Sequence, residues 1–147
     1  MNTMRTDIAM RQAPAKEHAQ FQKGSVLVEF ALILPMFLLL LFGVISFSIA
    51  LYDKTVLTMA AREGARAGAI YVANRTNAIT KNSATAAVTN ACQNNLISFG
   101  TAMTPSITFN ADPISDKQLT VTTTVNYTGL YIFQTLSISA QSSMRLE

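Results

Sequence analysis

The sequence predicts an α+β fold in which a long N-terminal transmembrane helix is followed by a second helix and a small three-stranded antiparallel sheet. Three observations support this class. An uncharged apolar run near the N-terminus is long enough to cross a membrane, an alanine-rich stretch without proline follows it, and the hydrophobic period changes from 3.6 to 2 after Gly100. At 147 residues the chain has room for one ordinary domain and an anchor.

The apolar run comprises 23 consecutive uncharged residues from Phe30 to Tyr52. As a helix it would extend about 35 Å, which is enough to cross a bilayer. Its apolar side chains point in every direction, and a chain of this size is too small to surround such a helix with protein. We therefore expect residues 25–52 to form a transmembrane helix in contact with membrane lipid.

The flanking charges predict the orientation of this helix. Residues 1–24 carry four basic and two acidic side chains, whereas the far flank opens with the balanced pair Asp53 and Lys54. Because basic flanks stay in the cytoplasm, we expect a basic cytoplasmic leader over residues 1–24 and a periplasmic C-terminal domain, on a single-pass protein of the bacterial inner membrane. The competing interpretation is a secretory signal peptide cut after Ala50, but its apolar core would span only about 7 to 15 residues.

Two residues of the apolar region are unusual for a membrane helix. An ionised carboxylate there is costly, so Glu29 is either shallow enough to reach the cytoplasmic headgroups or functional. Pro35 removes one backbone donor and leaves the carbonyl of Ala31 without its helical partner, which predicts a kink. The proline is either a tolerated membrane proline or part of a packing contact.

The residues around Glu29 resemble the type IV prepilin processing signal, which consists of a basic leader, a glycine, four residues, a glutamate and an apolar run. The stretch GSVLVEFALILP from Gly24, together with AAREGARAGAIY at Ala60 to Tyr71, is similar to the TadE-like family of the Tad (tight adherence, Flp) pilus system. The resemblance covers about a third of the chain. It leaves the TadE-like role and the closely related TadF-like role both open.

This resemblance implies a pseudopilin, a minor pilin-like component needed to assemble a Tad pilus for adhesion and biofilm formation. A prepilin peptidase would cut between Gly24 and Ser25, which makes Glu29 the fifth residue of the mature chain. Its carboxylate could then pair with the N-terminal ammonium of an adjoining subunit, where an isolated charge could not persist. The implied partners are the peptidase, other pseudopilins and the pilus assembly machinery, and the processed protein either stays in the membrane, joins the pilus or is secreted with it.

The helix is expected to continue beyond the membrane over residues 53–75. Small residues recur there at a spacing of four, at Ala60, Gly64 and Gly68, so they share one face and would let another helix approach closely. Arg62 and Arg66 are also four residues apart. From chemistry alone this is a solvated charged face beside an alanine-rich core face, whereas the family resemblance favours contact with partner pseudopilins.

Residues 76–147 are expected to form the small α+β domain. After a polar break at residues 74–77, helical spacing predicts a second helix from about Ser83 to Phe99, ended by Gly100. Alternation then predicts one short strand and two longer ones, separated by turns at Asp112 with Pro113 and at Gly129. The alternating residues are Ile107 and Phe109 in the first strand, Leu119, Val121, Thr123, Val125 and Tyr127 in the second, and Leu136, Ile138, Ala140 and Met144 in the third.

The chemical inventory predicts no enzyme, no cofactor and no metal site. The only histidine, His18, lies in the leader and would be lost with it. Cys92 is the only cysteine, so it is either a small buried hydrophobe or a thiol that pairs between chains, and a site of paired thiolates is excluded. Asp112, Asp116 and Lys117 are typical of a polar turn rather than a cation site.

The charge pattern also argues against a nucleic-acid partner. Of the formal net charge of +3, +2 lies in the leader, and the basic residues after Lys23 are scattered rather than clustered. The alternative function is a permanently membrane-anchored periplasmic binding or adhesion domain with no pilus role, in which Gly24 and Glu29 are coincidental.

Overall fold

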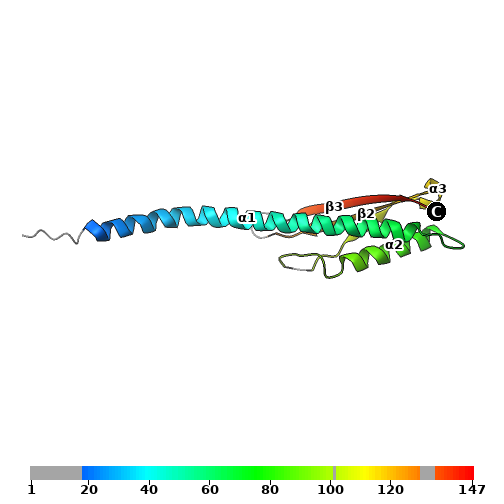
Figure 1. The fold of residues 1–147 in the computed structure, drawn as a ribbon, viewed down its shortest axis with the longest axis horizontal. Coiled ribbons are helices and arrows are strands. Elements are labelled where there is room, and N and C mark those ends of the chain that lie inside the picture. Colours follow the sequence, from blue (N-terminus) through cyan, green and yellow to red (C-terminus); the bar gives the residue numbers. More distant parts are fainter. Residues whose placement is uncertain (1–17, 101, 130–134) are drawn as a thin grey trace, which may run out of the picture. The chain divides into compact units, whose positions relative to one another are not determined.

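The computed structural model describes residues 18–100, 102–129 and 135–147 (Figure 1). Residues 1–17 of the predicted leader lie outside the described residues, and residues 18–24 form the start of a helix. The chain divides into two units, residues 1–40 and 41–147. The α+β class and the antiparallel sheet of three strands are confirmed. In chain order the described elements are α1 (His18–Ala69), α2 (Asn77–Cys92), β1 (Ser106–Phe109), α3 (Pro113–Asp116), β2 (Gln118–Tyr127) and β3 (Leu136–Arg145).

The described part of the first unit is helical, and its apolar side chains are exposed. From Gly24 to Leu40 no side chain is buried, and residues as hydrophobic as Leu32 and Met36 have 74% and 76% of their surface exposed. Pro35 lies inside α1. Soluble proteins do not expose large apolar side chains on every side of a helix. By length and composition, α1 is the candidate membrane span among the described residues.

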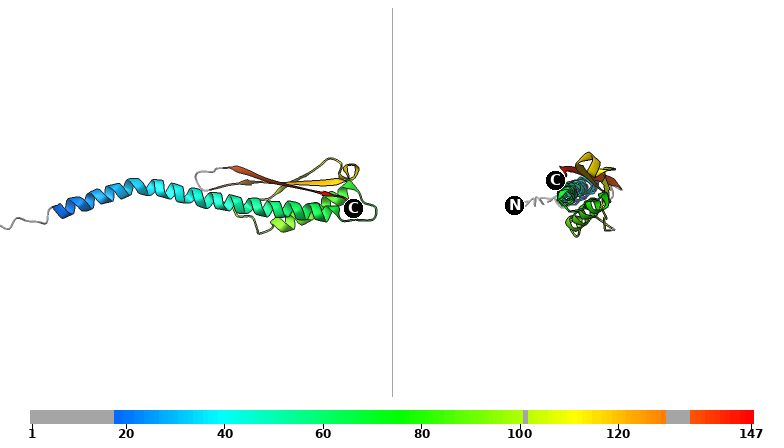
Figure 2. Two further views of the ribbon diagram at one scale, coloured as in Figure 1. Left: turned by 45° about the horizontal axis from the view of Figure 1, so that its top comes forward. Right: turned by 90° about the vertical axis from the view of Figure 1, so that its right-hand side faces the viewer.

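In the second unit, α1 packs against both α2 and the sheet (Figure 2). The contacts show that α2 runs back along α1, because the start of α2 lies beside the end of α1. The segment after α2 runs further back along α1, since the Ile97 amide donates a hydrogen bond to Oδ1 of Asp53 at 2.9 Å. The contacts in order along α1 are Gly68 with Thr80, Gly64 with Val88, and Asp53 with Ile97.

The sheet has the strand order β1-β2-β3, and β2 pairs antiparallel with both neighbours. Its buried face is the predicted one, since every second residue of β2 is buried: Leu119, Val121, Thr123, Val125 and Tyr127. The polar member of this set, Thr123, donates from its hydroxyl to the carbonyl oxygen of Leu57 at 3.3 Å. The central strand is thereby fixed on α1 by a hydrogen bond as well as by packing.

The hydrophobic core lies where α1, α2 and β2 meet, and its residues on α1 are small. Alanine and one leucine face α2 and the sheet, which brings the backbones close together. The partner elements supply the larger side chains. The buried core residues are Ala50, Leu57, Ala60, Ala65, Ala84, Val88, Cys92, Leu119, Val121, Val125, Tyr127, Ile138 and Ala140.

The second helix is shifted from its predicted bounds of Ser83 to Phe99. It begins six residues earlier because Thr76 caps it, with the threonine Oγ1 accepting a hydrogen bond from the Ile79 amide at 3.3 Å. It ends at Cys92, and Asn94 adopts a left-handed backbone with φ of 61°. The helix therefore ends seven residues before the predicted Phe99, and the predicted stop at Gly100 was wrong. Leu96 and Phe99 still pack against the core, but from an irregular segment.

The predicted strands hold closely, whereas α1 begins seven residues before the predicted Ser25 and ends six residues before the predicted residue 75. The continuation of α1 ends at Ala69, where Nη2 of Arg75 donates to the carbonyl oxygens of Ala69 and Ile70, the former at 3.0 Å. Basic groups are favourable at a helix C-terminus because they neutralise its exposed carbonyls. The turn expected at Asp112 and Pro113 contains the single helical turn α3.

Candidate functional site

The predicted processing residues Gly24, Ser25 and Glu29 lie on α1, and all three are exposed. A Cβ atom added to Gly24 would meet nothing within 4 Å. The Gly24–Ser25 peptide bond is helical, six residues after the first residue of α1. A peptidase needs access to both sides of this bond, so the first turns of α1 must unwind for cleavage. Glycine lowers the cost of unwinding, since it destabilises a helix by about 1 kcal/mol relative to alanine.

The glycine face of α1, made of Ala60, Gly64 and Gly68, is covered by the protein itself. A Cβ atom on Gly64 would lie 2.4 Å from Cγ2 of Val88 and 3.2 Å from the carbonyl oxygen of Ala84. No side chain fits at such distances, so the close approach of α2 requires glycine there. The helix that approaches this face is α2 of the same chain.

Gly68 is in an equally close contact one turn later. A Cβ atom there would lie 2.3 Å from Cδ2 of Leu119 and 3.0 Å from the backbone oxygen of Thr80. The first atom belongs to β2 and the second to α2, so Gly68 lies where both elements meet α1. The small residues of the motif therefore build the core of this domain and are not accessible to another subunit.

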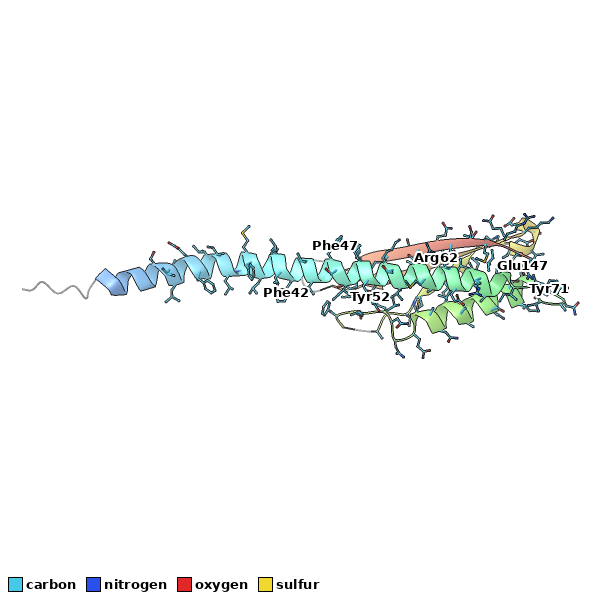
Figure 3. The ribbon with its side chains drawn as sticks, in the orientation of Figure 1. Phe42, Phe47, Tyr52, Arg62, Tyr71 and Glu147 are labelled. Atoms are coloured by element: carbon cyan, nitrogen blue, oxygen red, sulfur yellow. The ribbon has the colours of Figure 1, made fainter. Side chains whose placement is uncertain are left out.

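The two arginines of the same motif, Arg62 and Arg66, are both exposed. Figure 3 shows Arg62 projecting from α1. Neighbouring residues on this exposed side include Met59, with 62% of its surface accessible, and Glu63. Of the five residues predicted for helix packing, the structure brings three into the core and leaves the two arginines on the surface.

A buried polar cluster, formed by Ser46, Asp53 and Tyr127, was missed by the sequence analysis. All three residues are 0% exposed. Within the described part of the chain, Oδ2 of Asp53 has no hydrogen-bond partner, and the hydroxyls of Ser46 and Tyr127 have none other than each other. Burial raises the pKa of the Tyr127 phenol; the Ser46 hydroxyl opposes this shift and the nearby Asp53 charge adds to it.

The cluster has a sequence signal that would have revealed it. Ser46 and Asp53 are seven residues apart, so they lie on the same side of α1 two turns from each other. One buried stripe of α1 recurs at alternating spacings of four and three. Its members are Ser46, Ala50, Asp53, Leu57, Ala60 and Gly64. A small-residue stripe with this period indicates a helix face in close contact with protein, even inside an apolar run.

The predicted polar turn is held by hydrogen bonds around Asp112. Its carboxylate accepts from Nδ2 of Asn77 at 2.8 Å, from the Ser115 hydroxyl at 2.7 Å and from the Ser115 amide at 3.2 Å. These donors lower the pKa of Asp112 to about 2, with the Asn77 contact as the largest cause. Asp112 therefore ties the start of α2 to α3. Among the described residues, no group of three or more His, Cys, Asp or Glu side chains is arranged to hold a metal ion.

Cys92 is 4% exposed and packs in the core at the end of α2. Burial raises the pKa of its thiol, so the reactive thiolate is disfavoured. Of the two roles considered for this residue, the structure supports the small buried hydrophobe.

Comparison with known families identifies the first part of this architecture. A family model described as TadE-like protein matches residues 24–66. This segment is TadE-like. No curated protein and no solved structure matches the chain. The resemblance noted at Gly24 and in the alanine-rich stretch is therefore confirmed over these residues.

The TadE-like segment begins at the glycine of the processing signal and ends at Arg66, so it lies entirely within α1. It includes both the exposed apolar part of the helix and the first glycine that contacts α2. The elements that cover the TadE-like helix, α2 and the sheet, lie outside the matched residues.

Proposed function

We propose that this protein is a pseudopilin that takes part in assembling a Tad (Flp) pilus, which serves adhesion and biofilm formation. The observation that carries this proposal is where the family match begins. It starts at Gly24, the residue after which a prepilin peptidase would cut, and not at the start of the apolar run. A match of this extent is expected if the mature N-terminus, the glutamate and the helix act together as one functional unit.

The proposed location is the bacterial inner membrane. The residues from Ser25 to Ile45, of which none is buried, would cross the bilayer once, with the basic leader in the cytoplasm and the domain in the periplasm. This orientation puts the Gly24–Ser25 bond at the cytoplasmic surface. The exposure of the bond and the absence of contacts at Gly24 support access by a membrane-embedded peptidase.

After cleavage, Ser25 would carry a free ammonium group and Glu29 would be the fifth residue. Glu29 is exposed along with the apolar side chains around it, so it would be costly in lipid without a partner. An ammonium group of an adjoining subunit would supply that partner and fix the axial position of one helix against the next. Because the glycine face is covered within the chain, contacts with partner pseudopilins would use the exposed surface that includes Arg62 and Arg66.

Mass spectrometry of the membrane-extracted protein tests the processing step directly. We expect a mature chain that starts at Ser25 in cells that contain the peptidase, and the full chain in cells that lack it. The Gly24→Val variant should stay uncleaved, and its domain should fold normally because nothing contacts Gly24. A mature chain that begins at Met1 or Leu51 in the presence of the peptidase would contradict the proposal.

A second experiment separates the pseudopilin from a permanently anchored domain. The Glu29→Ala variant should insert into the membrane and fold like the natural protein, yet fail to support pilus assembly, because only the intersubunit charge pair is lost. Pili counted by electron microscopy give the readout, and membrane fractionation is the control. Normal piliation of Glu29→Ala would favour the anchored binding domain.

A further inference from the structure

The charged residues of the second unit are unevenly distributed over its helices and strands. Apart from Asp53 and Lys54, its charged side chains occur near the end of α1, at the start of α2, in and beside α3, and at the end of β3. The sequence has no charged residue between positions 82 and 111 or between positions 118 and 144. The charged residues of the second unit other than Asp53 and Lys54 are Arg62, Glu63, Arg66, Arg75, Lys81, Asp112, Asp116, Lys117, Arg145 and Glu147.

The tertiary contacts place these charges at one end of the unit. Leu119 lies beside Gly68, and the Glu147 amide donates to the carbonyl oxygen of Ala69 at 3.5 Å, so α3 and the end of β3 share the end of α1. Figure 3 shows Tyr71 and Glu147 together at this end. The opposite end of the unit carries only Asp53, which is buried, and Lys54, whose Nζ donates to the carbonyl oxygen of Ser139.

This opposite end exposes apolar side chains from three separate segments, which we call the apolar rim. Phe47, Leu51 and Tyr52 project from α1, and Figure 3 shows Phe47 and Tyr52 there. Leu136 at the start of β3 lines one groove with Phe47 and Leu51. Ile97 lies at the same end, because its backbone amide donates a hydrogen bond to Oδ1 of Asp53, the residue after Tyr52. The five rim residues are between 39% and 57% exposed.

The burial pattern along α1 changes at the point in the chain where the rim residues begin. From Ser25 to Ile45 no side chain is buried, and Ser46 is the first residue on α1 that the rest of the chain covers. Those 21 residues would extend about 31 Å as a helix. The hydrocarbon core of a bilayer is about 30 Å thick, so residues before Ser46 suffice to cross it. The rim residues Phe47, Leu51 and Tyr52 therefore follow directly in the chain after the residues that would cross the bilayer.

We propose that the apolar rim is a lipid-binding surface, by which the domain rests on the bilayer that its own helix spans. Ile97 and Leu136, together with Phe47, Leu51 and Tyr52, would lie in the boundary between headgroups and acyl chains. Apolar and aromatic side chains without charge are favoured there. The charged end faces away from lipid, since charged groups are the costliest to bring into it. This inference rests on the membrane anchoring in the proposed function.

Tryptophan substitution tests the rim, because the natural chain contains no tryptophan. Leu136→Trp reports on the rim, and Ile114→Trp on α3 at the charged end is the matched control, since the two natural side chains are 39% and 38% exposed. Phe37→Trp reports on the spanning segment. Each full-length variant would be reconstituted in phosphatidylcholine vesicles with or without brominated acyl chains, with iodide as the aqueous quencher and thermal unfolding as the folding check.

We expect brominated lipid to remove most of the fluorescence of Phe37→Trp and Leu136→Trp and little of that of Ile114→Trp, while iodide shows the reverse order. If Phe37→Trp is quenched by lipid but Leu136→Trp behaves like Ile114→Trp, the rim proposal is wrong and the anchoring stands. If Phe37→Trp is not quenched by lipid, the anchoring fails and the rim proposal fails with it.

The alternative occupant of the rim is a second copy of the chain. In that case the Leu136→Trp variant would be shielded from both quenchers, and the shielding would weaken as the protein-to-lipid ratio is lowered. That result would overturn the lipid assignment. Ile97→Trp repeats the measurement from the other side of α1, so a local disturbance at Leu136 cannot decide the outcome alone.

Discussion

The two parts of α1 invert the usual relation between hydrophobicity and burial. Up to Ile45 the helix consists largely of leucine, phenylalanine, isoleucine and methionine, and these side chains are exposed. From Ser46 onwards its buried positions are occupied mainly by alanine, glycine and two polar residues, and Leu57 is the largest apolar side chain among them. One helix thus has its most apolar surface uncovered and its least apolar stripe in the core.

This difference shows that the two parts are adapted to different surroundings. Large apolar side chains on all sides suit lipid, where no protein has to pack against them. Small residues suit close packing of backbones. The stabilising free energy then comes from dispersion contacts between closely spaced atoms rather than from the transfer of large side chains out of water. The acidic residues follow the same division: Glu29 is exposed in the first part, whereas Asp53 is buried and hydrogen-bonded by the domain in the second.

The largest expected effect comes from filling a glycine in the packed part. Gly68→Val should lower the free energy of unfolding by about 3 kcal/mol, because the new side chain would overlap Leu119 and the backbone oxygen of Thr80. The matched substitution in the exposed part is Gly24→Val, which should leave the stability of the domain unchanged. Thermal unfolding in detergent, followed by circular dichroism, measures both. Equal stability of the two variants would remove the distinction between the parts.

The next largest effect concerns the acid that the packed part buries. Asp53→Ala should cost about 2 kcal/mol, because the Ile97 amide loses its acceptor in a buried site. Asp53→Asn keeps an acceptor oxygen and should retain most of that stability, while Glu29→Ala should not change it. Denaturant titration in detergent compares the three. If Asp53→Asn is as unstable as Asp53→Ala, the negative charge matters and not the hydrogen bond.

A smaller effect is expected at the start of α2, the helix that covers the packed part. Thr76→Ala should cost about 1 kcal/mol, because the Ile79 amide loses the threonine oxygen that caps the helix. Thr85→Ala is the control, since its exposed hydroxyl bonds only to the carbonyl oxygen of Lys81 within α2. The difference between their unfolding midpoints isolates the cap. Identical midpoints would show that α2 does not need it.

The smallest effect is expected from acid at Asp112, which links α2 to α3. Its pKa is lowered from 3.8 to about 2, so its contribution to stability is complete above pH 4 and is lost as the pH falls through about 2. Asp112→Asn should remove this dependence while keeping an acceptor for the Ser115 amide. Unfolding midpoints measured between pH 5 and pH 2 should therefore converge for the two proteins at the acid end. Parallel curves would assign the acid sensitivity to other groups.

Much of this structure could be predicted from the pattern of residues. The apolar run predicted a helix in contact with lipid over its whole length, because 23 uncharged residues cannot be enclosed by so short a chain; the structure leaves residues 30–45 unburied but covers Ser46 and Ala50 with the domain. Alternation predicted the buried face of β2 at every position from Leu119 to Tyr127, because one side of the sheet must pack. The bounds of α2 were wrong because helical spacing at Leu96 and Phe99 was taken as helix, whereas both pack from an irregular segment. Thr76 was the missed signal.

The sequence alone determined the membrane-compatible helix, the TadE-like segment and the alternation of the sheet, since each depends on the period and polarity of neighbouring residues. Only the tertiary structure decided what covers Gly64 and Gly68, how Ser46 and Asp53 come together with Tyr127, and at which end of the domain most charged residues gather. These features join residues far apart in the chain. Their free energy comes from how closely α1, α2 and β2 pack, and no local pattern encodes that distance.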